Sequence, residues 1–268
     1  MDIIPNGTKR RLAKGDIALG FGVRQARTVD IASVAQACDF DWLFIDMEHG
    51  SMGVDLAAQL SVAALGTRIS PIVRVPGHEH YHATRVLDSG AQGVVVPHVD
   101  TAEQAKRIAS NCKYPPIGKR SVAGGMPQLN FKNLPVSEST RLINDETLVV
   151  VMLETPTAIG NADAIARVKG VDVLLIGTND LCAEMGIHGQ FGHPKVEDAY
   201  RKVIAAANKH GKYPGMGGVY DPQLMEKYIG MGMRFILSGS DLSFLMAGAK
   251  ARSTALRAAA PKKRKGKR

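Results

Sequence analysis

The sequence predicts a single-domain α/β fold, the (β/α)8 TIM barrel. Short runs of β-branched and other apolar residues alternate eight times with longer segments of helical periodicity. Eight such units in one chain favour a parallel sheet that closes on itself. The length of 268 residues is also typical of one barrel of this kind.

The strand candidates are near-continuous apolar runs, which is typical of parallel strands buried on both faces. They span residues 18–23, 42–46, 71–75, 92–96, 147–153, 172–176, 213–217 and 234–238. The amphipathic stretches expected to form helices span 28–38, 54–65, 80–89, 101–112, 156–168, 195–210, 221–231 and 241–257. An open, doubly wound sheet is the alternative, but no GxGxxG follows the first strand to support a dinucleotide site.

Residues 113–146 interrupt the alternation and are rich in Gly, Pro and Ser. A loop of this length inside a compact domain is usually functional or mobile. Because the segment comes after the fourth strand, we expect it on the side of the barrel where active sites form.

The composition indicates a globular protein, with 45% hydrophobic and 22% charged residues. The first residues lack the apolar stretch of a signal peptide, and no apolar run is long enough to span a bilayer. Cys38, Cys112 and Cys182 form no CxxC pair, which fits reduced thiols. We therefore expect a cytoplasmic protein with no membrane partner.

The positive charge is concentrated at the C-terminus. The last eight residues, PKKRKGKR, carry six of the positive charges behind the net charge of +9, which leaves +3 for the rest. We expect residues 1–260 to form the barrel and 261–268 to be a solvated, disordered tail. A weak electrostatic anchor or a nuclear-import-like signal is the alternative role. The remainder shows no aromatic-interleaved basic patch, so no specific nucleic-acid partner is expected.

Ionisable residues gather at the carboxyl ends of the predicted strands, where barrel active sites form. A single buried charge on a strand would be costly, so a convergent set indicates a site. The set comprises Asp46, Glu48 and His49 after strand two, Arg74 in strand three, His98 after strand four, Glu154 after strand five, and Gly177, Thr178, Asn179 and Asp180 after strand six.

Glu154 and Asp180 are the candidate metal ligands. Each closes an apolar strand, and neighbouring strands place them on one rim. Two carboxylates leave about four positions of an octahedral Mg²⁺ or Mn²⁺ for substrate and water. The alternative is structural: Glu154 caps the following helix and Asp180 begins the next.

Arg74 and His49 are the candidate groups for charge stabilisation and proton transfer. Arg74 could be a fixed cation facing an oxyanion, or it could form a salt bridge across the barrel. His49 lies close to Asp46 and Glu48, as in acid/base pairs, but a loop histidine bonded to backbone is equally compatible. No lysine lies at a predicted strand end, which argues against Schiff-base chemistry.

The histidines of HEHYH, His78, His80 and His82, suggest a metal cluster at first sight. Their spacing of two residues would bring them together only on an extended strand, and this stretch leads into a helix. We interpret them as a solvated helix start.

Several blocks, taken in order, resemble the HpcH/HpaI aldolases, a metal-dependent class II group acting on hydroxy-oxo acids and dehydro-deoxy-sugar acids. They cover the chain to about residue 257: FIDMEHG (44–50), PIVRVPG (71–77), YPPIGKRS (114–121), VVMLETPTAIGNAD (150–163), VDVLLIGTNDLCAEMG (171–186) and FILSGSDLSFL (235–245). The resemblance implies a (β/α)8 barrel, commonly a hexamer built as a trimer of dimers that exchange the last helix.

The resemblance also implies roles. It makes Glu154 and Asp180 ligands of Mg²⁺, Mn²⁺ or Co²⁺, and Arg74 the group that holds the pyruvate oxygen. His49, with Asp46 and Glu48, would be the acid/base group. The turn Gly177–Thr178–Asn179–Asp180 would cradle the pyruvate carboxylate, in keeping with anion binding at helix N-termini.

Three departures from the family pattern concern the aldehyde side and the metal surroundings. Met152 stands where better-known members carry Gln, Asn179 replaces a residue that is often small, and residues 123–131 differ. The expected activity is that of a class II aldolase, a carbon–carbon lyase. It would cleave or form 4-hydroxy-2-oxo acids through a metal-bound pyruvate enolate, with pyruvate or a related 2-oxo acid and an aldehyde as partners. The alternatives are a citrate-lyase or malyl-coenzyme A-lyase type enzyme and a catalytically silent sugar-acid binder.

Overall fold

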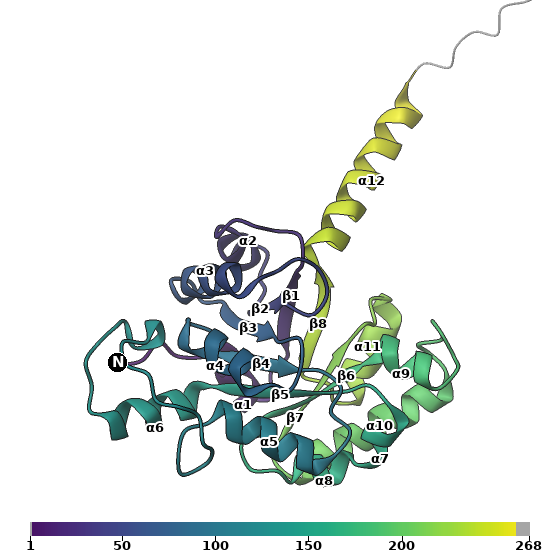
Figure 1. The fold of residues 1–268 in the computed structure, drawn as a ribbon. Coiled ribbons are helices and arrows are strands. Elements are labelled where there is room, and N and C mark those ends of the chain that lie inside the picture. Colours follow the sequence, from purple (N-terminus) through teal and green to yellow (C-terminus); the bar gives the residue numbers. More distant parts are fainter. Residues whose placement is uncertain (1, 261–268) are drawn as a thin grey trace, which may run out of the picture.

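Eight parallel strands pair in sequence order, and the first pairs with the last, so the sheet closes into a barrel (Figure 1). This computed structural model describes residues 2–260, and the tail predicted for 261–268 lies outside them. Within that range the strands are β1 Ala18–Val23, β2 Trp42–Asp46, β3 Ser70–Arg74, β4 Gly93–Val96, β5 Leu148–Leu153, β6 Val173–Gly177, β7 Tyr213–Gly217 and β8 Phe235–Ser240. The predicted (β/α)8 barrel is confirmed, with strand limits shifted by no more than two residues.

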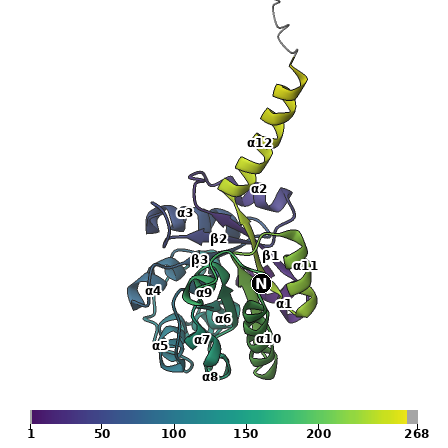
Figure 2. The same ribbon diagram turned by 90° about the vertical axis from the view of Figure 1, so that its right-hand side faces the viewer.

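Helices surround the barrel on the outside (Figure 2). The described residues form α1 Gly7–Ala13, α2 Ile31–Ala37, α3 Val54–Leu65, α4 His80–Asp88, α5 Ala102–Cys112, α6 Val136–Glu146, α7 Pro156–Gly160, α8 Ala162–Ala166, α9 Thr178–Glu184, α10 Pro194–Lys209, α11 Pro222–Met231 and α12 Asp241–Ala259, with a 3₁₀ turn at Pro127–Leu129. The single helix expected over 156–168 is instead two short helices on either side of Asn161.

The two faces of the strands build two separate cores, as parallel strands buried on both sides require. One core lies between the sheet and the helices, and the other fills the barrel interior. Inside, the Trp42 ring stacks on Phe235 with centroids 4.0 Å apart. Gly20 makes room for it, because a Cβ there would lie 2.3 Å from the Trp42 ring. Phe44 and Met152 extend the inner core towards the carboxyl ends of the strands.

The segment 113–146 lies at the amino ends of the strands, so the expectation that it borders the active-site side is wrong. Gln128 Nε2 donates to the carbonyl oxygens of Leu87 (2.7 Å) and Ala91 (2.8 Å), just before β4. Helix α6 and the 3₁₀ turn pack around Tyr114, Met126, Leu129 and Ile143. The physical reason is simple: α5 separates β4 from this segment and has already returned the chain to the other end.

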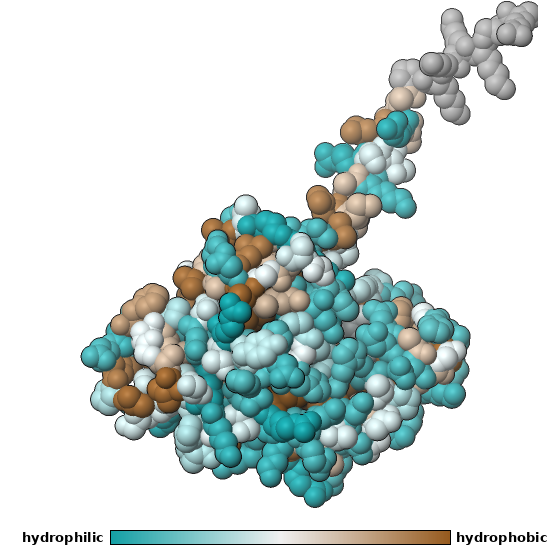
Figure 3. Space-filling view, viewed as in Figure 1, coloured by the Kyte–Doolittle hydropathy of each residue, from teal (hydrophilic) through white to brown (hydrophobic). Residues whose placement is uncertain are grey.

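Helix α12 extends away from the barrel, as both views show (Figures 1 and 2). Its first turn is fixed, because the Ser240 and Ser243 side chains form a capping box and the Phe244 ring contacts Phe21 and Phe40. No residue of the helix is buried. Apolar side chains therefore lie open along it (Figure 3), namely Leu242, Leu245, Met246 and Leu256.

None of the helices in residues 2–260 is both long and apolar enough to cross a membrane.

Candidate active site

Asp46, the last residue of β2, is fully buried and holds two arginines at the carboxyl end of the barrel. Arg74 Nε donates to Asp46 Oδ1 at 2.9 Å and Arg74 Nη2 donates to Oδ2 at 2.6 Å. Arg24, which follows β1, donates from Nε to the same Oδ2 at 2.9 Å. Burial alone would raise the pKa of Asp46, but the hydrogen bonds and charge of Arg74 outweigh it and hold the pKa below its usual value. Asp46 is therefore an anion that fixes two cations.

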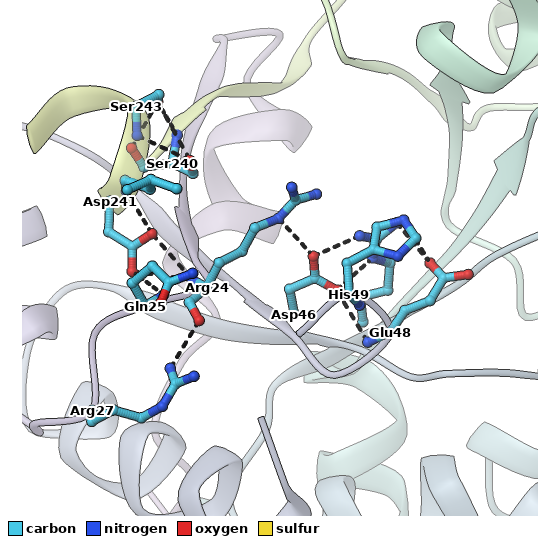
Figure 4. Close-up of polar contacts among 11 residues, drawn as sticks. Arg24, Gln25, Arg27, Asp46, Glu48, His49, Ser240, Asp241 and Ser243 are labelled. Atoms are coloured by element: carbon cyan, nitrogen blue, oxygen red, sulfur yellow. Dashed lines mark hydrogen bonds and ion pairs between the residues drawn. The ribbon is translucent and has the colours of Figure 1, made fainter. Parts of the chain in front are cut away.

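The loop after β2 places Glu48 and His49 beside this group (Figure 4). Asp46 Oδ1 accepts the backbone N–H groups of Glu48 and His49, so it shapes the loop. Glu48 faces the imidazole, with Oε2 4.0 Å from His49 Nε2. Glu48 Oε2 also lies 2.7 Å from Arg74 Nη1 and forms an ion pair with it. Among the described residues, this oxygen accepts no hydrogen bond. His49 thus has Glu48, and not Asp46, as its carboxylate neighbour.

His98 connects the two acidic residues of the site. It follows β4 with a left-handed backbone (φ 54°), and its N–H donates to Glu154 Oε2 at 2.7 Å. Its ring lies 3.3 Å from the same oxygen and 3.4 Å from Glu48 Oε1. The left-handed conformation is what turns both the N–H and the ring of one residue towards a single carboxylate.

Glu154 is 2% exposed and directs its carboxylate over the end of β6. A Cβ at Gly177 would lie 2.6 Å from Glu154 Oε1, so the glycine is what leaves space for that oxygen. Burial raises the pKa of Glu154 to about 7; the His98 N–H and ring lower it, and the charges of Asp180 and Glu48 raise it further. Asp180 lies in the first turn of α9 and is exposed.

A cavity of about 230 Å³ lies beside these residues at the carboxyl end of the barrel. It is lined by Arg24, Phe44, His49, Arg74, Met152, Leu175, Gly177, Thr178, Asn179, Asp180, Gly217, Gly218, Tyr220 and Leu237. Thr178 supports the wall from behind, because its Oγ1 donates to Gly217 O at 2.7 Å. Met152 and Asn179, two of the departures from the family pattern, thus both border the cavity, whereas residues 123–131 do not.

The carboxylates fit a hard divalent cation. Glu154 is buried next to the negative charges of Asp180 and Glu48, an arrangement that a cation would relieve. Carboxylate oxygens are the ligands that Mg²⁺ and Mn²⁺ prefer. Within residues 2–260 no group of three His, Cys, Asp or Glu side chains is placed to hold a metal ion.

The HEHYH histidines do not form a cluster. His78 Nε2 lies 2.7 Å from the carbonyl oxygen of Pro97, while His80 and His82 lie in the first turn of α4.

Sequence reasoning missed Arg24 and Tyr220 and gave His98 no role. Arg24 directly follows β1, so an inspection of the first strand end would have found it. Tyr220 lies three residues past β7, where no polar side chain closes the strand. The sequence places His98 at the end of its strand. Its hydrogen bond to Glu154 depends on a left-handed backbone conformation that cannot be predicted from the sequence.

A model of the family described as HpcH/HpaI aldolase/citrate lyase matches residues 24–247, which include every site residue above. The chain belongs to this family. It is 36% identical over 248 residues to 4-hydroxy-4-methyl-2-oxoglutarate aldolase tasA of Hapsidospora irregularis, covering 91% of this chain and 92% of the relative. It is 33% identical over 242 residues to 5-keto-4-deoxy-D-glucarate aldolase of Klebsiella pneumoniae, covering 90% and 92%.

The solved structures agree. The HpcH/HpaI aldolase from Desulfitobacterium hafniense DCB-2 matches with a TM-score of 0.88 at 30% identity, covering 94% of this chain and 97% of that one. The predicted family, barrel and aldolase activity, that of a carbon–carbon lyase, are therefore confirmed. HpcH/HpaI aldolases use divalent metal ions, as the carboxylate pair leads one to expect.

The contact between Gly177 and Glu154 gives a test of the cation site in this HpcH/HpaI aldolase. Gly177→Ala places a methyl group against the Glu154 carboxylate and should weaken Mn²⁺ binding, measured by calorimetric titration, at least about tenfold. Gly230→Ala is the matched control, because Gly230 lies on a helix with no atom within 4 Å of an added Cβ. Equal Mn²⁺ affinity in both variants would show that Glu154 is not a ligand of the cation.

Proposed function

We propose that this enzyme is a metal-dependent aldolase that cleaves and forms 4-hydroxy-2-oxo acids, with pyruvate or a related 2-oxo acid and an aldehyde as partners. The observation that carries the proposal is the placement of Arg74 and Asp180 in one cavity, with the Glu154 carboxylate directly beside Gly177 of the cavity wall. A fixed guanidinium beside a carboxylate pair suits a substrate whose neighbouring oxygens become negative during reaction. The aldolases named above support it, since the first acts on an oxoglutarate and the second on a keto-deoxy-sugar acid.

Glu154 and Asp180 would hold the divalent cation, Mg²⁺, Mn²⁺ or Co²⁺. That cation would act as a Lewis acid and as a template for the carboxylate and ketone oxygens of the 2-oxo acid. Gly177, Thr178, Asn179 and Asp180 form the wall at the start of α9, where backbone N–H groups favour a carboxylate. The 2-oxo acid is thereby oriented with its ketone oxygen towards Arg74.

Arg74 would stabilise the enolate. Its side chain is 5% exposed, it is held at two points by Asp46, and its centre lies 5.0 Å from the Phe44 ring centroid. A cation fixed in this way needs no rearrangement when charge develops on the substrate oxygen. The guanidinium N–H groups of Arg74 that are not paired with Asp46 or Glu48 remain available to the enolate oxygen of the substrate.

His49 would transfer the proton. Its ring lines the cavity, and its side chain is 56% exposed, so it can exchange protons with solvent. In cleavage, His49 removes the C4 hydroxyl proton, the C4–O bond becomes a carbonyl, and the C3–C4 bond breaks. The electron pair of that bond stays with the pyruvate fragment as an enolate, which then takes a proton at C3.

The exposed face of α12 favours assembly with further copies of this chain, and we propose the hexamer, a trimer of dimers, that the family resemblance implies. A helix whose Leu242, Leu245, Met246 and Leu256 face water needs a covering surface. Val34 of α2 and Val62 of α3 are also exposed on the outside of the barrel. The cytoplasmic location expected from the sequence stays a prediction.

Metal dependence can be measured without knowing the aldehyde. In D₂O, the enzyme with Mg²⁺, Mn²⁺ or Co²⁺ should exchange the methyl protons of pyruvate, followed by proton NMR, and excess chelator should stop the exchange. Borohydride should trap no adduct with pyruvate, because no lysine lines the cavity within the described residues. Exchange that persists in chelator, or a trapped adduct, would contradict the proposal.

The role of Arg74 can be separated from that of the fold. Arg74→Ala should slow pyruvate exchange about 10²- to 10³-fold, by analogy with loss of an oxyanion-binding donor. Arg74→Lys should recover part of the rate, because the charge returns without the planar fork. Arg68→Ala is the control, since Arg68 precedes the same strand at its other end and pairs with Asp39. Wild-type exchange by a folded Arg74→Ala protein would make Arg74 structural.

The oligomer prediction has its own measurement. Light scattering at micromolar concentration should give about six times the chain mass of 28.7 kDa. Replacing Leu245 and Met246 with Glu should lower the mass, because charge on the exposed face of α12 opposes burial. A monomer in the unaltered protein would contradict the assembly.

A further inference from the structure

Arg24 brings a second guanidinium into the cavity, and the enolate chemistry does not use it. Its Nε donates to Asp46 Oδ2, and its side chain is 43% exposed. Figure 4 shows the terminal nitrogens turned away from the Asp46 carboxylate. Over residues 2–260, these nitrogens make no hydrogen bond, and Asp46 is the only residue with which Arg24 forms an ion pair. The donors are therefore open towards the cavity that Arg24 lines.

The backbone around Arg24 is fixed before any substrate arrives. Asp241, the first residue of α12, accepts the backbone N–H groups of Arg24 (3.1 Å), Gln25 (2.7 Å) and Ala26 (2.6 Å). Arg27 Nη1 donates to the carbonyl oxygen of Arg24 at 2.8 Å. With its Nε held by Asp46 as well, Arg24 loses little conformational freedom when it binds a ligand.

The two arginines differ in what they can still bind. Arg74 is buried and pairs with Asp46 and Glu48, which leaves it few donors for the substrate. Arg24 has both terminal nitrogens available, the pair that matches the two oxygens of a carboxylate. Tyr220 lines the same cavity and interacts electrostatically with Arg24; burial raises the pKa of its hydroxyl, which therefore remains a donor.

We propose that Arg24 binds the carboxylate of the carbonyl acceptor, so that the enzyme selects 4-hydroxy-2-oxo acids with a second carboxylate. This inference rests on the proposed aldolase function. Cleavage would give pyruvate and a second fragment that carries both a carbonyl and a carboxylate, such as a 2-oxo acid or an aldehydo acid. With a neutral aldehyde, the terminal nitrogens of Arg24 would face the cavity without an anion to bind.

The test compares acceptors that differ in charge at equal chain length. With pyruvate as donor, kcat/KM is measured for glyoxylate against glycolaldehyde and for succinic semialdehyde against butanal. The wild-type enzyme should prefer the anionic member of at least one pair. Arg24→Gln should reduce that preference about 10- to 100-fold, the range expected for loss of a charge-assisted hydrogen-bonded pair. Using the ratio cancels any general loss of activity.

Two further variants sharpen the result. Arg24→Lys should keep part of the preference, because charge remains without the fork. Arg68→Gln is the control: it removes the same charge, but Arg68 precedes β3 at the amino end of the strand, pairs with Asp39 and does not line the cavity. Its ratio should stay within about twofold of wild type if long-range attraction is small.

The outcomes separate the two proposals. If pyruvate exchange proceeds but Arg24→Gln keeps the wild-type ratio, or if the wild type prefers the neutral member of both pairs, the assignment of Arg24 is wrong and the aldolase proposal stands. If the wild type with metal shows no pyruvate exchange, the proposed function fails and the Arg24 assignment fails with it. A ratio that falls for Arg24→Gln and not for Arg68→Gln supports the assignment.

Discussion

The buried carboxylate of Asp46 is the interaction on which the site depends. Five donors converge on it, from two arginine side chains and from two backbone N–H groups of the following loop. A buried carboxylate is costly unless hydrogen bonds and opposite charge compensate it, and both oxygens of Asp46 accept such bonds. Arg24, Asp46 and Arg74 belong to three adjacent segments of the barrel, so one anion sets the positions of groups that are distant in the sequence.

This arrangement divides the cavity by charge. The guanidinium groups of Arg24 and Arg74 lie at the ends of β1 and β3, and the carboxylates of Glu154 and Asp180 lie after β5 and β6. His98, after β4, lies between them and contacts both Glu48 and Glu154. The basic side suits oxygens that carry negative charge, and the acidic side suits a cation. Strand order around a closed sheet is what keeps the two sides apart.

The sequence was sufficient for the barrel, because alternation of apolar runs and helical segments reflects burial directly. It also placed charged residues at strand ends, since a charge on a buried strand is costly wherever it occurs. Helices α1 and α6 were missed because they are short or polar, and segment 113–146 was assigned to the wrong end. The segment lies at the other end because α5 reverses the direction of the chain after β4.

The side-chain partners were harder to predict than the positions. His49 is expected to have both Asp46 and Glu48 behind it. Glu48 does face its ring, whereas Asp46 faces the arginines and binds the backbone of His49. Asp46 and His49 are only three positions apart, but the direction of each side chain depends on the side chains of the neighbouring strands. Arg74, 28 residues away, is the stronger partner because β3 lies directly beside β2.

Helix α12 is joined to this site by one residue, and that limits how the helix can be shared. Asp241 binds three consecutive N–H groups of the loop that carries Arg24, and the Phe244 ring packs on Phe21 and Phe40 of the same chain. The first turn therefore belongs to its own barrel. The most exposed apolar side chains of α12 follow Phe244, where Leu245 and Met246 are 68% and 59% exposed. A partner can cover that apolar face without displacing the loop that carries Arg24. Assembly through α12 therefore leaves the position of Arg24 unchanged.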